Sequence, residues 1–472
     1  MARIKLFELS ALTGALLVLT SCTTPGSSWL AGDHHIHSRF SVGWDREQNP
    51  PAPIIGGDAI YPTPVNASMA RRFGLSWMVT TDHGGPNHSK VNRDMAYPEL
   101  IQSRTEVKEV IQFYGMELNT PAGDHSSLII PHSADEADVL FRLESDFDKL
   151  ETFPLDPARD TEDRMIAALE VMRALEKPPV VIANHPSRSA RGYGEYGMYD
   201  PAEFRRWNDA APNVAIGMAG APGHQAMALA PVITNELQRV RGAYRGFHTM
   251  GGFDQMTAKL GGFWDSMLGE GRHWWITANS DSHRHYTEGG VDFWPGEYSK
   301  TYVYAEKNYD SILSALRAGK VFVTTGDLVS EIYLEVTQEN RSATIGEEIT
   351  VYPGSEITVK IRIRDPHAKN AVEENPEVNR VDLIVGEITG SVEDRTANSN
   401  GSTRVSQRFT SLTWRREGEY LTMSYALRVP GSMYVRIRGT NTFELEPEQD
   451  PPAENPWSDL WFYSNPVFIK VH

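Results

Sequence analysis

Histidines and carboxylates follow the ends of a series of strand-like segments, and this pattern limits the fold more than any other feature of the chain. Thirteen of the 15 histidines lie between His34 and His285. Short clusters of His, Asp, Glu and Asn occur at positions 33–37, 81–83, 117, 124–125, 184–185 and 281–283. A single cluster of this kind more often caps a helix or forms hydrogen bonds within a loop. A succession of them indicates that several strand ends meet at one functional rim.

Strand-like and helical segments alternate over roughly the first 300 residues, the pattern of βα units. The apolar runs that indicate strands are 75–80, 111–116, 127–130, 179–183, 214–218 and 274–278. Residues 160–177 place apolar side chains at helical spacing after Asp160, which is predicted as the N-cap. This alternation predicts a parallel α/β barrel or a doubly wound sheet.

The last third of the chain has a different periodicity. Residues 357–363 interleave isoleucine and valine with polar residues, and residues 433–438 repeat the alternation. One apolar and one polar face are typical of antiparallel strands. We therefore expect residues 329–472 to form a β-sandwich accessory domain, after a first domain that covers residues 29–328.

The N-terminus has the order of an export signal. Residues 1–22 contain a short positive head, an apolar stretch and a Leu-Thr-Ser-Cys ending. The ending resembles a bacterial lipobox, in which the cysteine is lipidated. Because Cys22 is the single cysteine of the chain, a lipoprotein is favoured over a plain signal peptide with an incidental Cys. Residues 23–28 form a polar tether, and Thr23 in place of Asp favours the outer membrane, on the periplasmic side of the envelope.

The order of the polar motifs resembles that of a known enzyme family. His35 and His37 are two residues apart, so an extended segment presents both imidazoles on one side, as a pair of metal ligands. In chain order the motifs are HxH, TDH, GxE, H, NHP and SDxH. This order resembles the polymerase-and-histidinol-phosphatase (PHP) family of metallophosphoesterases over residues 29–326. The resemblance implies a distorted (β/α)7 barrel, similar to a TIM barrel, with up to three metals at its mouth.

The resemblance also implies a ligand set for each metal. The set for the first metal is His35, His37, Glu117 and Asp281. The set for the second is Glu117, His125 and His185, and that for the third contains His83 and His283. Glu117 would therefore bridge the first two ions. Imidazoles with a few carboxylates suit Zn, Mn or Fe better than Ca or Mg alone.

One position departs from the family pattern. Family members commonly carry a carboxylate or a histidine shortly after the HxH pair, and that residue completes the third set. This chain reads Ser41-Val42-Gly43 there; valine cannot bind a metal, and Asp45 is out of register. We therefore expect two firmly held divalent ions and a third that is weak, altered or absent. His83 and His283 would then bind substrate or donate a proton.

A second resemblance concerns residues 219–225. This segment is similar to one in exported two-domain PHP-like hydrolases with a C-terminal β-sandwich, a group that includes carbamate-insecticide hydrolases. The resemblance makes His224 a candidate for the pocket, with a structural loop histidine as the alternative. Arg188, three residues after His185, is a candidate for holding an anionic oxygen, with a solvated loop charge as the alternative.

The expected activity is hydrolysis, with a phosphoesterase favoured over two alternatives. Glu117 between two cations leaves a shared position for water, and the cations lower the pKa of that water so that a bridging hydroxide forms. His283, His83 and His224, in that order, are candidates for protonating the leaving group. The alternatives are a carbamate, carboxyl-ester or amide hydrolase on the same metals, and a surface lipoprotein that only binds.

Charge narrows the expected substrates and partners. With few basic residues in the motifs and an incomplete third ligand set, the pocket suits a monoanion, which favours small phosphodiesters over phosphomonoesters. Lys plus Arg is 45 and Asp plus Glu is 62, so the net charge is −17. Nucleic acids and anionic membranes select cationic faces. We therefore expect a small phosphate ester as substrate, no nucleic acid, and membrane contact through the N-terminal lipid alone.

Overall fold

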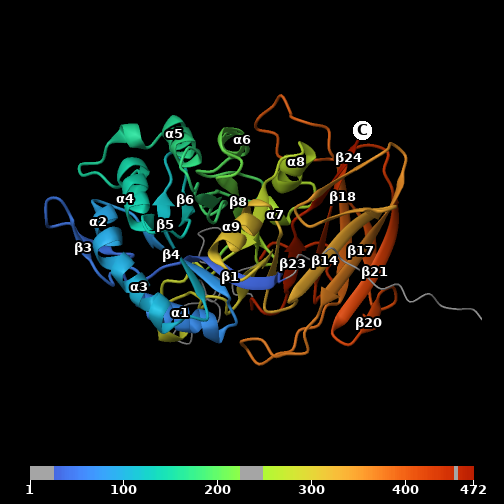
Figure 1. Ribbon diagram of the computed structural model, residues 1–472, viewed down its shortest axis with the longest axis horizontal. Helices are drawn as coiled ribbons and strands as arrows, with labels where there is room; N and C mark the ends of the chain where they lie inside the picture. The colour runs from blue at the N-terminus through green and yellow to red at the C-terminus, as the bar shows by residue number, and fades with distance from the viewer. Residues whose placement is uncertain (1–25, 224–247, 451–454) are drawn as a thin grey trace, which may run out of the picture.

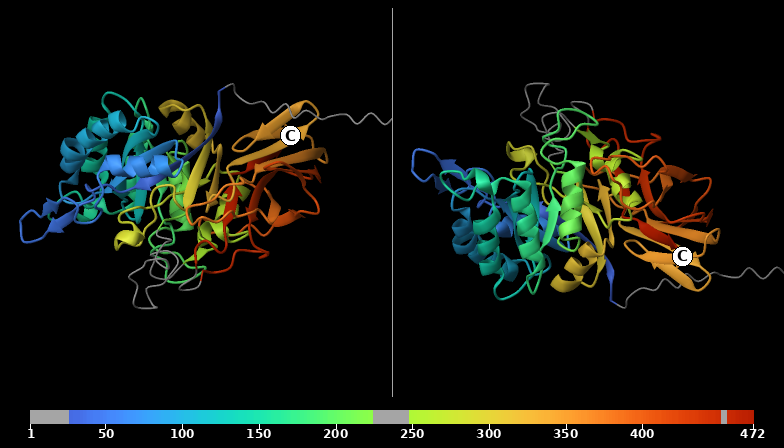
Figure 2. Two further views of the ribbon diagram at one scale, coloured as in Figure 1. Left: turned by 90° about the horizontal axis from the view of Figure 1, so that it is seen from below. Right: turned by 90° about the horizontal axis from the view of Figure 1, so that it is seen from above.

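An α/β part and a β-rich part make up the molecule. The computed structural model describes residues 26–223, 248–450 and 455–472. In the first part helices pack outside a curved sheet, and the C-terminal residues form the β-rich part (Figure 1). The two parts lie side by side along the long axis (Figure 2). This architecture confirms the prediction of an α/β fold followed by a β-rich region.

Two of the predicted functional residues, Cys22 and His224, lie outside the described residues. The lipoprotein signal and the envelope localisation therefore stay predictions. Within the described ranges, no helix combines the length and the apolar composition that crossing a membrane requires.

The strands of the first part form a curved, mixed sheet. In spatial order they are β11 (Trp275–Ala278), β8 (Ala215–Ala221), β7 (Val180–Ala183), β6 (His125–Ile130), β5 (Ile111–Asn119), β4 (Trp77–His83), β1 (Ser28–Ile36), β12 (Ser299–Ala305) and β13 (Val321–Thr325). β6 is antiparallel to β5 and β7, and β12 is antiparallel to β1 and β13. The other neighbours in this series are parallel.

The sheet curls, but its hydrogen-bond ladders do not close it. Among the described strands, β11 pairs with β8 alone, so the predicted (β/α)7 barrel is not confirmed. β11 approaches the far end of the sheet at Thr301 of β12. The Thr301 hydroxyl accepts the Ala278 N–H and donates to the Ala278 carbonyl, each at 2.7 Å. At the rim, a parallel bridge joins Ile36 to Ser282. These contacts bring the carboxyl ends of β1 and β11 together.

Helices cover the outer face of this sheet. In chain order, the helices of the first part are α1 (Thr63–Arg72), α2 (His88–Val91), α3 (Tyr97–Glu106), α4 (Glu136–Phe147), α5 (Glu162–Arg173), α6 (Pro201–Ala210), α7 (Gln255–Ala258), α8 (Phe263–Gly269), which also contacts the C-terminal region, and α9 (Tyr309–Arg317), with a π-helical turn, η1 (Asn92–Ala96), and the 3₁₀ turns η2 (Pro157–Arg159) and η5 (Tyr286–Glu288), the last near the rim of the sheet. Their buried apolar side chains, such as Leu140 of α4 and Leu169 of α5, join the same core as Leu128 and Val181 of the sheet.

The helix predicted over residues 160–177 is shorter than expected. Thr161, and not Asp160, is the N-cap of α5, because its hydroxyl accepts the Arg164 N–H at 3.2 Å. The Asp160 carboxylate instead accepts the Ala122 N–H at 2.7 Å. The helix ends at Arg173, before the Pro178-Pro179 pair, which a helix could not include.

The C-terminal strands form two layers. They are β14 (Glu331–Gln338), β15 (Arg341–Thr344), β16 (Glu348–Val351), β17 (Glu356–Arg364), β18 (Arg380–Glu387), β19 (Arg404–Phe409), β20 (Arg415–Glu417), β21 (Tyr420–Arg428), β22 (Met433–Thr440), β23 (Trp461–Ser464) and β24 (Val467–Val471). One layer has the order β15-β14-β17-β21-β20. Alternate residues of β17, such as Ile361, are buried against Leu383 and Ile437 of the other layer. This burial is the period-two pattern visible in the sequence.

The large sheet continues from the first part into the C-terminal region. β13 pairs with β23, and β23 pairs with β22. The Asn465 side chain also accepts the Ile276 N–H at 3.0 Å. Two short hairpins, β2 (Gly43–Asp45) with β3 (Ala52–Ile54) and β9 (Thr249–Met250) with β10 (Phe253–Asp254), lie outside this sheet. The predicted boundary at 328/329 falls between β13 and β14 and stays a prediction.

A buried ion pair fixes the loop that follows the HxH motif. His88 and Glu144 are fully buried, with Nδ1 and Oε1 2.7 Å apart, and His88 Nε2 donates to the Phe40 carbonyl at 2.8 Å. Burial alone would lower the pKa of His88, but the charge of Glu144 and the hydrogen bonds to Glu144 and Phe40 together outweigh burial and raise the pKa to about 9. The imidazolium is therefore the folded-state form at neutral pH.

This pair makes stability depend on alkaline pH. Since the folded-state pKa lies above the ordinary 6.5, the contribution of His88 is complete below about pH 6.5 and is lost as pH rises through about 9. We expect His88→Asn to lower the free energy of unfolding at pH 6 by roughly 1–3 kcal/mol. Urea unfolding at a series of pH values should show the difference from wild type shrinking toward pH 9. A difference that grows with pH would contradict this assignment.

Candidate metal centre

The HxH motif lies at the carboxyl end of β1, where the strand changes register. The pairing of β1 with β4 shifts between Asp33 and Ile36. His35 and His37 then present their rings to one side, with their Nε2 atoms 3.0 Å apart. His34 points elsewhere and bonds to the hydroxyls of Ser127 and Thr277. The two-residue spacing therefore places the predicted pair together, as expected for extended backbone.

Glu117 is the centre of the cluster. This β5 residue is fully buried, and each of its carboxylate oxygens faces imidazole nitrogens. The contacts to Oε1 are His35 Nε2 at 3.0 Å, His125 Nδ1 at 3.1 Å and His185 Nε2 at 3.2 Å, and those to Oε2 are His83 Nδ1 at 2.9 Å and His37 Nε2 at 3.5 Å. A single carboxylate surrounded by five imidazoles is the arrangement expected of a shared metal ligand.

The hairpin of β5 and β6 brings His125 to this centre. β5 ends at Asn119, the chain turns back, and His125 opens β6 opposite Asn119. The antiparallel pairing therefore returns His125 to the side of Glu117 although eight positions separate them. His185 follows β7, and its backbone φ is 30°. A left-handed φ in a residue other than glycine stores strain, which is concentrated at functional sites.

Asp281 closes the opposite side of the cluster. Its Oδ1 lies 3.0 Å from His37 Nε2 and 3.2 Å from His35 Nε2. Its backbone is also left-handed, with φ 47°. The backbone on both sides of this contact is fixed by Asp33, whose carboxylate accepts the His35 and Ser280 N–H groups. Asp33 thus links the HxH motif to the segment that carries Asp281.

Three groups of donor atoms converge closely enough to hold a metal ion each. They are His35, His37, Glu117 and Asp281; His83, Glu117 and His125; and His37, His83 and His283. His185 adds its Nε2 to the Glu117 side. A buried cluster of imidazoles and carboxylates of this kind can hold divalent ions, and its N and O donors suit transition metals. As ligands, the individual residues stay predictions.

Electrostatics keep two of the donors, Glu117 and His185, in forms that bind metals. Although burial disfavours its charged form, the neighbouring His125, His35 and His83 hold the pKa of Glu117 well below its usual range. Burial, together with Arg188, lowers the pKa of His185 to about 4. Glu117 is therefore a carboxylate and His185 a neutral imidazole, and these are the protonation states of metal ligands.

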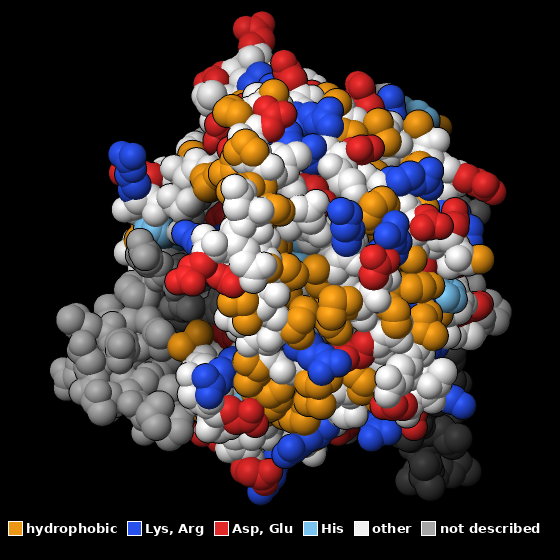
Figure 3. All heavy atoms as spheres, turned by 90° about the vertical axis from the view of Figure 1, so that its left-hand side faces the viewer, with side chains coloured by type: hydrophobic (Ala, Val, Ile, Leu, Met, Phe, Trp, Pro, Cys, Tyr) orange, Lys and Arg blue, Asp and Glu red, His pale blue; other side chains and the backbone are white. Residues whose placement is uncertain are grey.

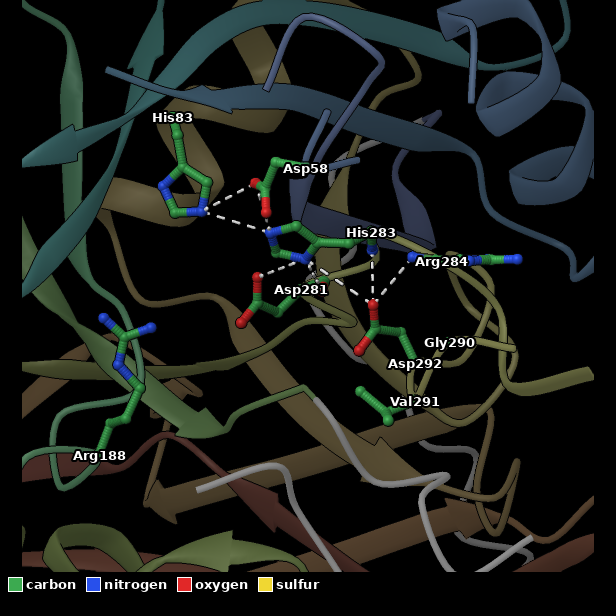
Figure 4. Close-up of a pocket in the computed structure, with 9 residues that line it drawn as sticks. All are labelled: Asp58, His83, Arg188, Asp281, His283, Arg284, Gly290, Val291 and Asp292. Carbon is green, nitrogen blue, oxygen red and sulfur yellow. Dashed lines mark hydrogen bonds and ion pairs between the residues drawn. The ribbon is translucent and has the colours of Figure 1, made fainter. Parts of the chain in front are cut away.

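Sequence reasoning missed Asp58. Figure 4 shows its carboxylate pointing toward His83 and His283, with Oδ2 3.7 Å from His83 Nε2 and 3.5 Å from His283 Nε2. The loop that carries Asp58 is pinned to the segment around Val42, because the Ala59 N–H donates to the Ser41 carbonyl at 3.2 Å. Asp58 therefore supplies a carboxylate beside the two imidazoles where Val42 cannot. No spacing in the sequence pointed to it.

A cavity of about 360 Å³ opens on this cluster. Its lining residues are Asp58, His83, Arg188, Asp281, His283, Arg284, Gly290, Val291 and Asp292. The Arg188 guanidinium points into the cavity from the side opposite Asp58, whereas that of Arg284 points away (Figure 4). Arg188 is held by both oxygens of Asp124, with Nε at 3.1 Å from Oδ2, and its Nη2 lies 3.3 Å from His125 Nδ1. Arg188 is therefore an ion-paired charge at the rim, and about a third of its side chain, 33%, is exposed.

The comparisons with known proteins add a distant likeness. No family model matches the chain, and no curated protein is similar to it. Among solved structures it is similar to Endonuclease Q in complex with a 27-mer duplex substrate with an abasic lesion at the active site, with 13% identity and a TM-score of 0.33. The match covers 62% of this chain and 56% of that chain, so it spans little more than half of the neighbour.

The expectation that nucleic acid is not a partner is wrong as an exclusion, since the similar structure holds a duplex substrate. The exclusion failed because it was based on the net charge of the whole chain and not on the charge near the site. The value of −17 describes the whole chain, whereas basic and acidic side chains are interspersed on the face in Figure 3. Local charge at a site, which metal ions would change further, decides whether a polyanion binds.

Proposed function

We propose that the protein is a metal-dependent phosphoesterase that hydrolyses phosphodiester bonds. The observation that carries this proposal is the position of Glu117, a buried carboxylate within 3.5 Å of five imidazole rings. The order of its motifs, which resembles that of the PHP family, supports the same conclusion.

The residues fit two divalent ions that share Glu117. His35, His37 and Asp281 would complete one set, and His125 with His185 the other. When bound, such ions lower the pKa of water and polarise a phosphoryl oxygen. The chain itself contributes Arg188, which holds an anionic oxygen of the substrate at the rim, and His283, which lies in the cavity wall and donates a proton to the leaving group while no third ion is bound to it.

The charge of the cavity favours a monoanionic substrate. Besides Asp281, which would hold one of the two ions, the carboxylates of Asp58 and Asp292 line it, and Arg188 is the lining cation that points inward. A phosphomonoester brings two negative charges toward these carboxylates, whereas a phosphodiester brings one. We therefore propose diesters over monoesters.

A matched substrate panel tests this function. The metal-loaded protein would be assayed for kcat/KM on a monoester and a diester of one alcohol, the corresponding carboxyl and carbamate esters, and a duplex oligonucleotide. We expect the diester to be hydrolysed fastest. A monoester preference of about tenfold, or 1.4 kcal/mol of transition-state stabilisation, would contradict the diester assignment. Hydrolysis of the carbamate or carboxyl ester alone would overturn the phosphoesterase, and metal binding without any hydrolysis would indicate a binding protein.

Asp58 gives a separate prediction about a third ion. Because its carboxylate lies beside His83 and His283, we expect a third, weaker ion there. Asp58→Ala should weaken that ion by about tenfold or more, as loss of a metal-supporting carboxylate does, and leave the two ions at Glu117 unchanged. Calorimetric titration with Mn²⁺ or Zn²⁺ would measure this, with Asp45→Ala as the control. Equal titration curves for the two variants would contradict a role for Asp58.

A further inference from the structure

The C-terminal β-rich region reaches the rim of the candidate metal centre through one short hairpin. Two segments are involved: the Arg188 loop, residues 185–199, and the supporting hairpin, residues 249–254, which contains β9 and β10. The supporting hairpin bonds to the Arg188 loop on one side and to the C-terminal region on the other.

The contacts with the Arg188 loop are buried and directional. The Asp254 carboxylate, fully buried, accepts the Ser187 N–H at 2.9 Å and the Ser187 hydroxyl at 2.7 Å. Next to the hairpin, His248 Nε2 donates to the Ala190 carbonyl at 2.7 Å, and the Tyr193 hydroxyl donates to the Thr249 carbonyl at 2.8 Å. Ser187 is adjacent to Arg188, so the hairpin determines where the Arg188 backbone lies.

The contacts with the C-terminal region are equally specific. Asp450 is buried and accepts the Gly252 N–H at 3.0 Å through Oδ2, while its own N–H donates to the Thr249 carbonyl at 3.0 Å. The Gly251 N–H donates to the Glu448 carbonyl at 3.1 Å. Gly251 has φ 57°, and a Cβ there would lie 2.6 Å from Trp461 Nε1 of β23. Glycine is thus required for the hairpin to approach β23.

We propose that Asp450 is a positioning residue for substrate binding, and that the C-terminal region holds Arg188 in place through the supporting hairpin. The proposal rests on the function proposed above in one respect, that Arg188 binds the substrate anion. The chain of contacts runs from Asp450 to Gly252, along the hairpin to Asp254, and from Asp254 to Ser187. Without the Asp450 carboxylate the hairpin is held less firmly, so the Arg188 loop opens more often although Asp124 and Gln255 still bond to it. Arg188 is then displaced from the rim for part of the time, while the cluster around Glu117 keeps its residues.

Hydrogen exchange and kinetics of the metal-loaded, full-length protein test this proposal. In Asp450→Ala, amide exchange in residues 185–199 should be about tenfold faster or more, since a hydrogen bond to a charged acceptor is lost. KM for the diester, and the inhibition constant for inorganic phosphate, should rise about tenfold with less than a twofold change in kcat. Metal content should be unchanged. Asp450→Asn keeps an acceptor oxygen for the Gly252 N–H and should restore exchange and KM to near wild type.

Two further variants keep the test decisive. Ser187→Ala removes one bond to Asp254 and leaves the Ser187 N–H bond, so it should give a smaller change in the same direction even if Asp450→Ala does not fold. Glu347→Ala is the matched control, because Glu347 also accepts a backbone N–H, that of Thr344 at 3.0 Å. It should change neither exchange in residues 185–199 nor KM.

The outcomes separate this proposal from the proposed function. Unchanged exchange in residues 185–199 in both Asp450→Ala and Ser187→Ala would overturn the positioning role, whatever the activity. Faster exchange with an unchanged KM and an unchanged inhibition constant would overturn it as well, because Arg188 would then not depend on the hairpin. Faster exchange in a protein that hydrolyses no phosphate ester would leave the contact pathway supported and would refute the phosphoesterase instead.

Discussion

Glu117→Gln is expected to abolish both metal binding and hydrolysis. A glutamine keeps the size of the side chain, but its amide nitrogen cannot bind a cation, and the negative charge shared by two ions is lost. Loss of residues that only support a ligand already costs 10–100-fold in metal affinity or activity, so loss of a shared ligand should lower kcat/KM by more than about 100-fold. Elemental analysis and steady-state kinetics of the same preparation would measure the two effects.

Glu144→Gln is the control for this experiment. Glu144 is another fully buried glutamate within 2.7 Å of an imidazole, that of His88, but it lies outside the three donor groups. Its replacement should lower stability and leave metal content near that of wild type. If Glu117→Gln retained both its ions and its activity, Glu117 would not be the shared ligand.

The second large effect is expected at the junction of the two parts of the molecule. Asp265 of α8 accepts Arg436 Nε at 3.0 Å and Nη2 at 2.8 Å, together with the Tyr434 hydroxyl at 2.9 Å. These three residues are buried. Asp265→Ala leaves the Arg436 charge buried without its partner, which costs about 3–5 kcal/mol. Urea unfolding of the full chain would measure the loss of the free energy of unfolding.

An exposed ion pair of the C-terminal region is the matched control. Arg415 and Glu417 lie 2.9 Å apart with side chains 81% and 61% exposed, so Glu417→Ala should cost less than about 1 kcal/mol. A similarly small effect of Asp265→Ala would mean that the junction contributes little and that the two parts are held together by other contacts.

Much of the candidate centre could be predicted because it depends on local backbone geometry. A spacing of two places His35 and His37 on one side of any extended segment, and polar residues after buried strands gather at one rim. This pattern includes Glu117 and Asp281, whose roles as ligands are what the resemblance to the PHP family implies. Those residues come together because β1, β4, β5 and β11 all deliver their carboxyl ends to the same place.

The remainder depends on tertiary contacts that no local pattern contains. Asp58 reaches His83 and His283 because a loop folds back on the segment around Val42. The antiparallel direction of β6 follows from a tight turn after Asn119, which apolar periodicity does not specify. The same holds for β13 and β23, whose pairing joins strands far apart in the sequence and carries the large sheet into the C-terminal region.

A metal titration of the metal-free, full-length protein tests the proposed metal-dependent hydrolysis most directly. Mn²⁺ or Zn²⁺ would be added in steps, and bound ions per chain and the rate of phosphodiester hydrolysis would be followed together. We predict no hydrolysis without metal, a rate that rises with occupancy, and a maximum when two ions are bound at Glu117. Full hydrolysis in the metal-free protein, or two bound ions with no hydrolysis of any phosphate ester, would contradict a metal-dependent phosphoesterase.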